Sequence, residues 1–405
     1  MHLTIYNIFT AVLLWHFNLA AMATNNVSRQ SPVCLMYLTG QHDLIPEDPK
    51  MTDPITHVVL AFLRSTLFLE DERTEWPLFR TVEATREHFS PDTQVLVAIG
   101  GWGDNGFAEA AKDDSSRKVF AQNIAKMVKD TGADGIDVDW EYPGGNGEDY
   151  KQVPNSAKAW EIEAYPLLLD AIRAALGPSK LMTAAVPGLE RDMLAFTDQT
   201  VPHIMENLDF LNVMTYDLMN RRDTVTKHHS SIQGSREALQ AYVLRGAPAE
   251  KLNLGLAFYV KWFKTDAQEE CGSFTLSASP VGCKTQLLED PTSGADLGRA
   301  GGFSWHDKTP SELEESFLRA QSELQYDKEK GASYYWDTKE QLWWTFDVGS
   351  NGDIVRKVRT LRGEMNLAGV FAYGLGEDGV DFHHLDQLLA ALREEGENES
   401  VHDEL

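Results

Sequence analysis

Four acidic residues stand within one short segment of this 405-residue chain, the segment 134–141 with the sequence DGIDVDWE. In a β-strand, alternate side chains point to the same face, so Asp137, Asp139 and Glu141 would share one side. Carboxylates this close raise the pKa of at least one member, as general acid catalysis requires. An acidic strand at a sheet edge or a cation site is the alternative, but such a strand gains nothing from the apolar residues on its reverse face.

Apolar segments alternate with helical patterns along the chain. We expect eight strands, at Val33–Leu38, Thr56–Leu63, Gln94–Ile99, Gly135–Trp140, Leu181–Val186, Phe210–Tyr216, Asn253–Phe258 and Gly369–Tyr373. Helical patterns between them include Ser116–Lys129, Ala157–Leu176, Ser235–Arg245 and Arg356–Met365. Apolar strands separated by helices are typical of a parallel sheet. Eight such units favour an α/β fold of the closed (β/α)8 TIM-barrel type over an open doubly wound sheet, and no dinucleotide-binding glycine motif follows the first strand.

The spacing breaks between the seventh and eighth strands. Residues 264–345 contain Gly, Ser, Pro, a pair of cysteines and two aromatic segments, at 333–337 and 343–345. This stretch is too long for a simple loop. We therefore predict a small α+β subdomain inserted into a barrel that spans residues 30–393, forming one wall of a groove at the carboxyl ends of the strands.

The composition limits the partners. There are 62 acidic against 36 basic residues, a formal net charge of −26 at pH 7. This charge argues against nucleic acid and against anionic membrane surfaces, whereas a neutral glycan would be indifferent to it. No metal-ligand spacing is visible, so we expect neither a metal nor another cofactor. The adjacent histidine pairs at 228–229 and 383–384 are interpreted as surface or loop residues.

Both ends of the chain carry targeting patterns. Residues 3–23 lack charged side chains and end in Ala-Met-Ala, which predicts a cleaved signal peptide at 1–23, with an uncleaved anchor as the alternative. An acidic tail at 394–405 ends in His-Asp-Glu-Leu, a retrieval signal of the endoplasmic reticulum. We expect a monomer in the lumen of that compartment, bound by the retrieval receptor and not inserted in the membrane, and secreted if retrieval is inefficient.

The cysteines and sequons agree with a secretory compartment. Cys271 and Cys283 stand in a polar region and can close a short disulfide, whereas Cys34 lies in an apolar run and is expected to be a buried free thiol. Asn26 and Asn398 each begin an N-x-S sequon and are candidate glycosylation sites.

The DxxDxDxE pattern of residues 134–141 resembles the fourth-strand signature of glycoside hydrolase family 18. Ala98–Trp102 resembles the third-strand S-x-G-G motif of this family, and Met214–Asp217 resembles its sixth-strand M-x-Y-D motif. The insertion resembles that of the chitinase subgroup, with the fungal chitinases as the nearest likeness. The resemblance covers nearly the whole mature chain.

The resemblance implies retaining, substrate-assisted hydrolysis. Glu141 would be the general acid. Asp139 comes from the same strand as Glu141 and is poorly placed as a nucleophile, so the 2-acetamido carbonyl of the substrate attacks instead. Asp139 would orient that amide and stabilise the oxazolinium intermediate, Asp137 would share a proton with Asp139, and Tyr216 would donate its hydroxyl to the acetamido oxygen.

Further positions follow from the same resemblance. Asp217 would contact the same sugar, and Trp102 would stack on a sugar on the leaving side. Core packing is the alternative for several other groove candidates, namely Tyr37, Phe62, Met214 and Tyr259. Asp134 is assigned a supporting role.

Two residues depart from the family pattern. The eighth strand ends in Tyr373 where a Trp is usual, which reduces the stacking area. Ala98 stands where Ser is usual, which removes a hydroxyl that could hold the aspartate pair.

Three functions remain open on this basis. The first is a chitinase that cuts β-1,4 bonds between N-acetylglucosamine units. The second is an endo-β-N-acetylglucosaminidase acting on the chitobiose core of N-glycans, which the retrieval signal favours. The third is a chitin-binding lectin without catalysis, which the presence of Glu141 disfavours.

Overall fold

The computed structural model describes residues 31–70, 73–266, 281–348 and 352–402. The predicted signal peptide, Asn26, Cys271 and the last three residues lie outside these ranges. The backbone of Asn398 is described, as part of a helix, but its side chain is not. No helix in the described ranges combines the length and the hydropathy that crossing a membrane requires.

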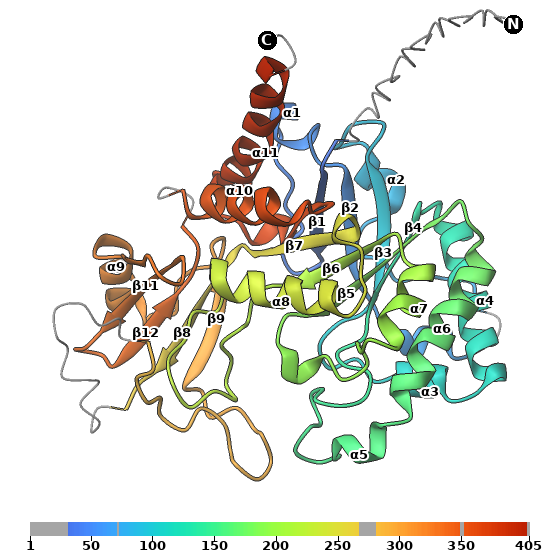
Figure 1. The fold of residues 1–405 in the computed structure, drawn as a ribbon, viewed down its shortest axis with the longest axis horizontal. Coiled ribbons are helices and arrows are strands. Elements are labelled where there is room, and N and C mark those ends of the chain that lie inside the picture. Colours follow the sequence, from blue (N-terminus) through green and yellow to red (C-terminus); the bar gives the residue numbers. More distant parts are fainter. Residues whose placement is uncertain (1–30, 71–72, 267–280, 349–351, 403–405) are drawn as a thin grey trace, which may run out of the picture. The chain divides into compact units, whose positions relative to one another are not determined.

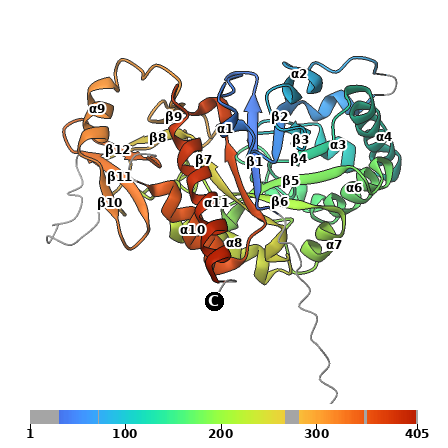
Figure 2. The ribbon, with the colours of Figure 1, turned by 90° about the horizontal axis from the view of Figure 1, so that it is seen from above.

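Eight parallel strands form a closed barrel (Figures 1 and 2). In order around the barrel they are β1 (Val33–Thr39), β2 (His57–Leu63), β3 (Gln94–Gly100), β4 (Gly135–Asp139), β5 (Leu181–Pro187), β6 (Phe210–Met214), β7 (Leu252–Ala257) and β13 (Gly369–Tyr373), which pairs with β1. The predicted TIM barrel is confirmed. Three strands, β4, β6 and β7, end before their predicted limits, so that Glu141 lies two residues beyond β4 and Tyr216 two residues beyond β6.

Helices surround the barrel, as Figure 2 shows. They are α1 (Pro49–Thr52), α2 (Val82–Arg86), α3 (Phe107–Ala111), α4 (Asp114–Thr131), α5 (Asn155–Lys158), α6 (Glu161–Leu176), α7 (Thr200–Asn207), α8 (Ile232–Leu244), α10 (Asp353–Met365) and α11 (His383–His402). Their ends follow local chemistry. The side chain of Asp113 caps α4 by accepting from the Ser116 N–H, and Gly132 ends that helix in the left-handed conformation.

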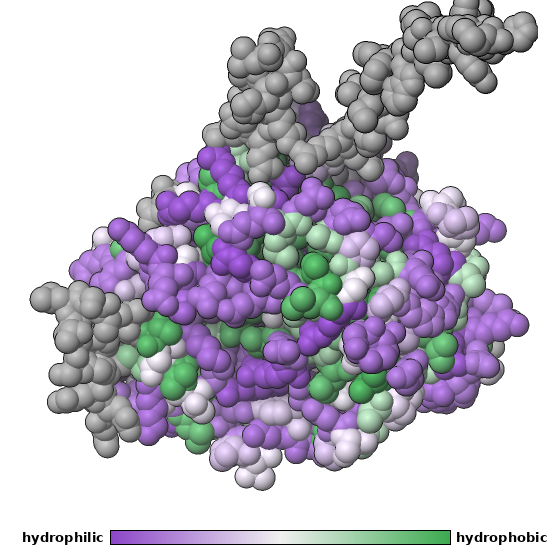
Figure 3. All heavy atoms as spheres, viewed as in Figure 1, coloured by the Kyte–Doolittle hydropathy of each residue, from purple (hydrophilic) through white to green (hydrophobic). Residues whose placement is uncertain are grey.

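Two apolar layers follow from the alternation of side chains along the strands. In β1, Cys34, Met36 and Leu38 point to the layer shared with the helices, whereas Leu35 and Tyr37 point into the barrel. Cys34 is a buried free thiol, as predicted, and burial raises its pKa to about 12. Hydrophilic side chains cover most of the face shown in Figure 3, with small separate apolar patches between them.

A second sheet is built from the chain between β7 and β13. It is antiparallel, with the order β10 (Gln325–Asp327), β11 (Ala332–Asp337), β12 (Leu342–Thr345), β8 (Tyr259–Lys264) and β9 (Ala300–Ser304), and α9 (Glu314–Ser322) accompanies it. β8 begins five residues before the predicted start of the insertion, because only Phe258 separates it from β7. Trp343 and Trp344 are fully buried on opposite faces of β12, which explains the aromatic segment.

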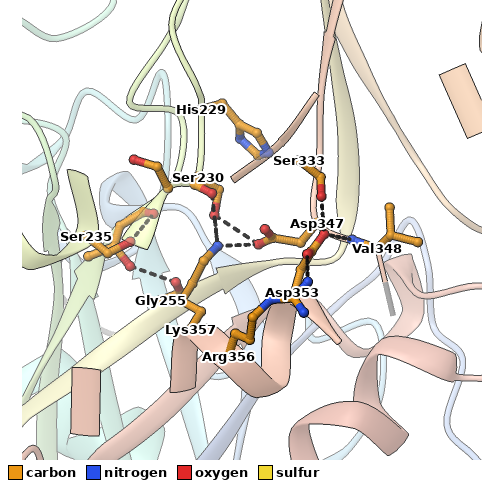
Figure 4. Close-up of polar contacts among 12 residues, drawn as sticks. His229, Ser230, Ser235, Gly255, Ser333, Asp347, Val348, Asp353, Arg356 and Lys357 are labelled. Carbon is orange, nitrogen blue, oxygen red and sulfur yellow. Dashed lines mark hydrogen bonds and ion pairs between the residues drawn. The ribbon is translucent and has the colours of Figure 1, made fainter. Parts of the chain in front are cut away.

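A buried ion pair joins the second sheet to the helices of the barrel (Figure 4). The ammonium of Lys357 in α10 lies 2.5 Å from the carboxylate of Asp347, just after β12, and donates to Ser230 Oγ at 2.6 Å. Ser333 in β11 donates to Asp353 of the same helix at 2.6 Å. The two parts of the fold are therefore connected by specific polar contacts as well as by the chain.

Candidate active site

Asp137 and Asp139 both point into the barrel from β4, because they are two residues apart on one strand. Asp137 is fully buried and accepts hydrogen bonds from Tyr37 Oη at 2.7 Å, Thr183 Oγ1 at 2.5 Å and Asn212 Nδ2 at 3.1 Å. Burial raises the pKa of Asp137, and these bonds oppose the rise. The strand thus places the hydrogen-bonded carboxylate of Asp137 beneath that of Asp139.

Asp139 is the less satisfied member of the pair. It is buried, and its Oδ1 has no hydrogen-bond partner within the described residues. Burial first, and then the charges of Glu141 and Asp137, raise its pKa well above the usual range. The two aspartates therefore favour sharing one proton over both being ionised.

Glu141 follows at the mouth of the barrel, beyond the end of β4. Its side chain is half-buried, and burial raises its pKa to about 7, with Asp217 and Asp192 adding to the rise. A carboxyl group with this pKa is still partly protonated at neutral pH and can give up its proton, as a general acid does.

Two glycines at the end of the third strand, the last residue of β3 and the one after it, hold the end of β4 in place. The Gly101 N–H donates to the carbonyl of Asp139 at 2.9 Å. A Cβ atom on Gly100 would lie 2.1 Å from that same carbonyl oxygen, and Gly100 has a φ of +113°. Glycine is needed here because no side chain fits between the two strands.

A groove of about 580 Å³ opens above these carboxylates. Every residue predicted for catalysis or sugar binding lines it, with the exception of Asp137: Asp139, Glu141, Tyr216, Asp217, Trp102, Tyr373, Tyr37, Phe62, Met214 and Tyr259. The rings of Tyr37 and Tyr259 lie 6.1 Å and 6.3 Å from that of Tyr373. Trp102 is 43% exposed, and the guanidinium of Arg222 lies 5.7 Å from its ring. Residues of β8 and β9 form part of the opposite wall.

Asp217 is held by Tyr259, a predicted groove residue, and by two residues that the sequence did not single out, Lys261 and His229. It turns with a φ of +52° and accepts from Tyr259 Oη at 3.0 Å and from Lys261 Nζ at 3.2 Å, both on β8. His229 Nδ1 lies 3.6 Å from the same carboxylate. Although burial acts to raise it, the pKa of Asp217 is lowered well below its usual range by Lys261 and His229.

The histidine pairs, predicted to be surface or loop residues, are only partly so: His228 and His229 lie in an irregular segment, whereas His383 and His384 begin α11. His228, His229 and His384 are buried, and His383 is half-buried. His228 bonds Asp327 at 3.1 Å, and His384 bonds Asp378 at 2.6 Å. Asp327 is 99 residues from His228, so the local sequence carries no sign of that pair, whereas Asp378 stands only six residues before His384.

Asp134 lies at the other end of β4 and has a different environment. It accepts from Arg86 Nη2 at 2.5 Å and from the Val95 N–H at 2.8 Å. Because it precedes β4, whereas Glu141 follows it, Asp134 supports the strand and does not reach the groove.

The missing hydroxyl at position 98 has a replacement. Ala98 pairs with Asp137 from β3, and Thr183 pairs with Asp137 from β5 on the other side. The hydroxyl of Thr183 therefore donates to Asp137 in place of the hydroxyl that is absent at position 98. Asn212, itself held by Asn253 at 2.9 Å, adds a second contact that no local motif indicates.

The family model described as "Glycosyl hydrolases family 18" matches residues 28–378. The chain belongs to family 18. Among curated family relatives, it is 28% identical to Chitotriosidase-1 of Mus musculus over 55% of this chain and 51% of that protein. It is 25% identical to Chitinase B of Serratia marcescens over 85% of this chain and 76% of that protein. The chain thus spans about half the length of the mouse relative.

Solved structures share the family 18 fold. A chitinase from Rhizomucor miehei matches with a TM-score of 0.68 at 22% identity, over 89% of this chain and 99% of the other. Catalytic domain 2 of the Group II chitinase of Ostrinia furnacalis matches with a TM-score of 0.67 at 22% identity, over 90% and 97%. A family 18 chitinase mutant from Cycas revoluta, solved with (GlcNAc)4, matches with a TM-score of 0.62 at 20% identity, over 89% and 99%.

Proposed function

We propose that this protein is a retaining chitinase, which hydrolyses β-1,4 bonds between N-acetylglucosamine units in chitin or its oligosaccharides. The observation that carries the proposal is the single strand that presents Glu141 at the groove, above Asp139 and Asp137. The family relatives that bear the name chitinase, and the Cycas structure with (GlcNAc)4, support this substrate class.

In the proposed first step, Glu141 gives its proton to the leaving oxygen while the 2-acetamido carbonyl of the substrate attacks the anomeric carbon. Asp139, as the anion, accepts the acetamido N–H and stabilises the positive oxazolinium ion. Its proton partner Asp137 then carries the shared proton. Tyr216 donates to the acetamido oxygen, and Asp217 binds the same sugar.

In the second step, the deprotonated Glu141 takes a proton from water, and the water oxygen attacks the anomeric carbon from the face that the leaving group vacated. The oxazolinium ring opens and the acetamido group is regenerated. Two displacements at one carbon give retention of configuration.

In this proposal the two sides of the groove bind different parts of the glycan. Trp102, exposed and accompanied by Arg222, stacks on a leaving-side sugar. Tyr373, with Tyr37 and Tyr259 around it, supports the sugar that is cleaved. A tyrosine ring offers less area than an indole, so we expect weaker binding there than in relatives with a tryptophan.

A second candidate shares the chemistry but not the substrate. The chain ends in His-Asp-Glu-Leu, and the lumen of the endoplasmic reticulum holds N-glycoproteins, so cleavage of the chitobiose core of N-glycans is the alternative. The wall that β8 and β9 add to the groove favours linear oligomers and hence the chitinase. A lectin without catalysis is the third candidate, and Glu141 disfavours it.

The cellular setting is part of the proposal. We place the protein in the lumen of the endoplasmic reticulum after removal of residues 1–23, as a monomer retrieved through its last four residues. In that oxidising compartment Cys271 and Cys283 would form a disulfide, and Asn26 and Asn398 would accept glycans. The location is tested by inserting a fluorescent protein before the last four residues and comparing this fusion with one that lacks those four residues.

Purified protein should be assayed on chitin oligomers and on a high-mannose glycopeptide. Cleavage of the oligomers with β-anomeric products supports the chitinase. Cleavage of the glycopeptide alone would favour the second candidate, and binding without cleavage of either would favour the lectin.

A variant tests the acid. Glu141→Gln keeps the shape of the side chain but removes the proton, so we expect hydrolysis to fall by about 10² to 10⁴-fold or more while oligomer binding is retained. Glu250→Gln, an exposed position away from the groove, is the matched control and should keep wild-type rates. An active Glu141→Gln enzyme would show that another group is the acid.

A further inference from the structure

The loop that begins at Glu141 is held by an arginine from another part of the barrel, Arg222. Glu141 lies two residues beyond the end of β4, so the strand pairing that fixes Asp139 does not extend to the acid. Arg222 lies in the loop after β6 and lines the groove, and 13% of its side chain is exposed. The mechanism above gives Arg222 no part in the reaction.

The guanidinium of Arg222 binds this loop in two ways. Its Nη2 donates to the carbonyl oxygens of Asn146 at 2.9 Å and of Gly147 at 3.1 Å. Its central carbon lies 3.7 Å from the centre of the Tyr150 ring, which is a cation–π contact. A planar group with donors at its edge and a face for stacking makes both contacts at once, which the ammonium of a lysine cannot do.

Gly147 connects these contacts to the acid. A Cβ atom on Gly147 would lie 2.8 Å from the carbonyl oxygen of Glu141, so the chain at residue 147 returns to lie against the main chain of Glu141. The loop thus closes between residues 141 and 147, and Arg222 binds it at the point of closure. Loss of the two hydrogen bonds from Arg222 would therefore loosen the main chain that carries the acid.

Arg222 is itself fixed in place. Its N–H donates to Asn220 Oδ1 at 3.1 Å, and the Asn220 N–H donates to Asp223 Oδ2 at 2.9 Å. Its Nη1 lies 3.7 Å from the buried carboxylate of Asp192, which follows β5. The guanidinium therefore joins the loops that follow β4, β5 and β6, and the first of these carries the acid.

We propose that Arg222 is a positioning residue for the general acid, which holds the loop after Glu141 so that the carboxyl group stays within reach of the leaving oxygen. The inference rests on the proposed function. Arg222 acts through main-chain contacts and gives no proton, so its loss leaves the acid present but poorly placed. General acid catalysis is sensitive to such a displacement, because the proton is transferred over hydrogen-bond distance.

A second role for Arg222 must be separated from this one. Arg222 lies 5.7 Å from the ring of Trp102, so its loss could also weaken the binding of a leaving-side sugar. Aryl chitobiosides separate the two roles, because they carry a phenol in place of that sugar. A phenol of low pKa leaves with little help, whereas one of high pKa needs the proton of the acid.

The measured quantity is kcat of the full chain on the chitobiosides of phenol, nitrophenol and dinitrophenol. Arg222→Ala should reduce kcat about 10- to 100-fold for the phenol and less than about threefold for the dinitrophenol, so that the plot of log kcat against leaving-group pKa becomes steeper. Arg236→Ala, the same change in an exposed ion pair on α8, is the matched control and should keep the wild-type slope. Added guanidinium ion should restore part of the loss in Arg222→Ala and none in Glu141→Gln.

Arg222→Lys repeats the test if Arg222→Ala fails to fold. It keeps the charge but cannot bind both carbonyls and the ring together, so we expect it to steepen the same plot. An equal loss on all three substrates, or no loss, would overturn the proposal, because the position of the acid would then not depend on Arg222. Cleavage of chitin oligomers by the wild-type chain would leave the proposed function standing in that case. A wild-type chain that cleaved neither these oligomers nor the aryl chitobiosides would overturn the proposed function, and this inference with it.

Discussion

Asp137 accepts hydrogen bonds from three neutral donors, and this holds its pKa below the value that burial alone would give. Tyr37→Phe removes the donor at 2.7 Å, so the pKa of Asp137 should rise. The acid limb of the pH–activity profile, where the aspartate pair becomes fully protonated, should then move up by about one pH unit.

Tyr242→Phe is the matched control for that measurement. It also removes a buried phenol, here one that donates to the carbonyl of Pro187 at 2.8 Å. We expect it to lower stability by about 1 kcal/mol without moving the acid limb. A shift of the same size in both variants would show that the effect is not specific to Asp137.

The basic limb of the same profile reports Glu141. Burial raises its pKa to about 7, so the proton needed by the leaving oxygen is present below that pH and is lost above it. The ratio kcat/KM should therefore fall as the pH rises through about 7. A profile that stays flat to pH 9 or so would exclude Glu141 as the acid, because its proton would be absent there.

For single residues, the sequence predicts the reacting acids better than it predicts the side chains that hold them. The acids of β4 share one short motif, and the period of a strand places them on one face. Thr183, Asn212 and Lys261 come from other strands and are common residue types, so no spacing singles them out. The burial of His229 beside Asp217 was not predicted for the same reason, since that contact is found only through the fold.

The carboxyl ends of the strands position the side chains of the groove, and β3 and β4 approach each other closely at Gly100. Gly100→Ala would place a Cβ atom 2.1 Å from the carbonyl of Asp139 in a left-handed conformation. We expect a loss of about 3 kcal/mol or more in the free energy of unfolding, measured in urea, because neither strand can move away.

Gly132→Ala is the comparison at the end of α4. Gly132 has a φ of +72°, and a Cβ atom there would meet nothing within 4 Å. Its replacement should cost about 1 kcal/mol, from backbone conformation alone, and leave activity unchanged. Equal costs for the two alanines would mean that the close approach at Gly100 is relieved by movement.

Most elements follow from their apolar patterns, because buried parallel strands read as apolar runs between helices. The differences lie at their ends. β4 ends before Glu141 and β6 ends before Tyr216, and after β6 the chain turns at Asp217. The spacing of the apolar residues does not predict that turn.

A buried charge pair is one of the contacts that join the two parts of the molecule. Lys357 and Asp347 are 1% and 2% exposed in their side chains. Lys357→Met would leave a buried carboxylate without its cation and should cost about 3 to 5 kcal/mol in the free energy of unfolding. The double variant with Asp347→Leu should recover most of that loss.

Arg236→Ala is the control for this pair. It removes an ion pair with Glu364 whose side chains are 30% and 44% exposed, and we expect a cost of about 1 kcal/mol or less. If Lys357→Met cost no more than Arg236→Ala, the buried pair would contribute nothing beyond a surface contact. The sequence indicates neither pair, since each joins residues brought together only by the fold.

β8 begins only one residue after β7, and that residue, Phe258, is itself buried and donates its N–H to the carbonyl of Tyr373. Tyr259 and Lys261, both partners of Asp217, lie on this same strand. The second sheet is therefore not a module that recombination could exchange freely. Any graft that replaced it would have to supply a new hydroxyl and a new cation for Asp217, so the wall of the groove and part of its chemistry are inherited together.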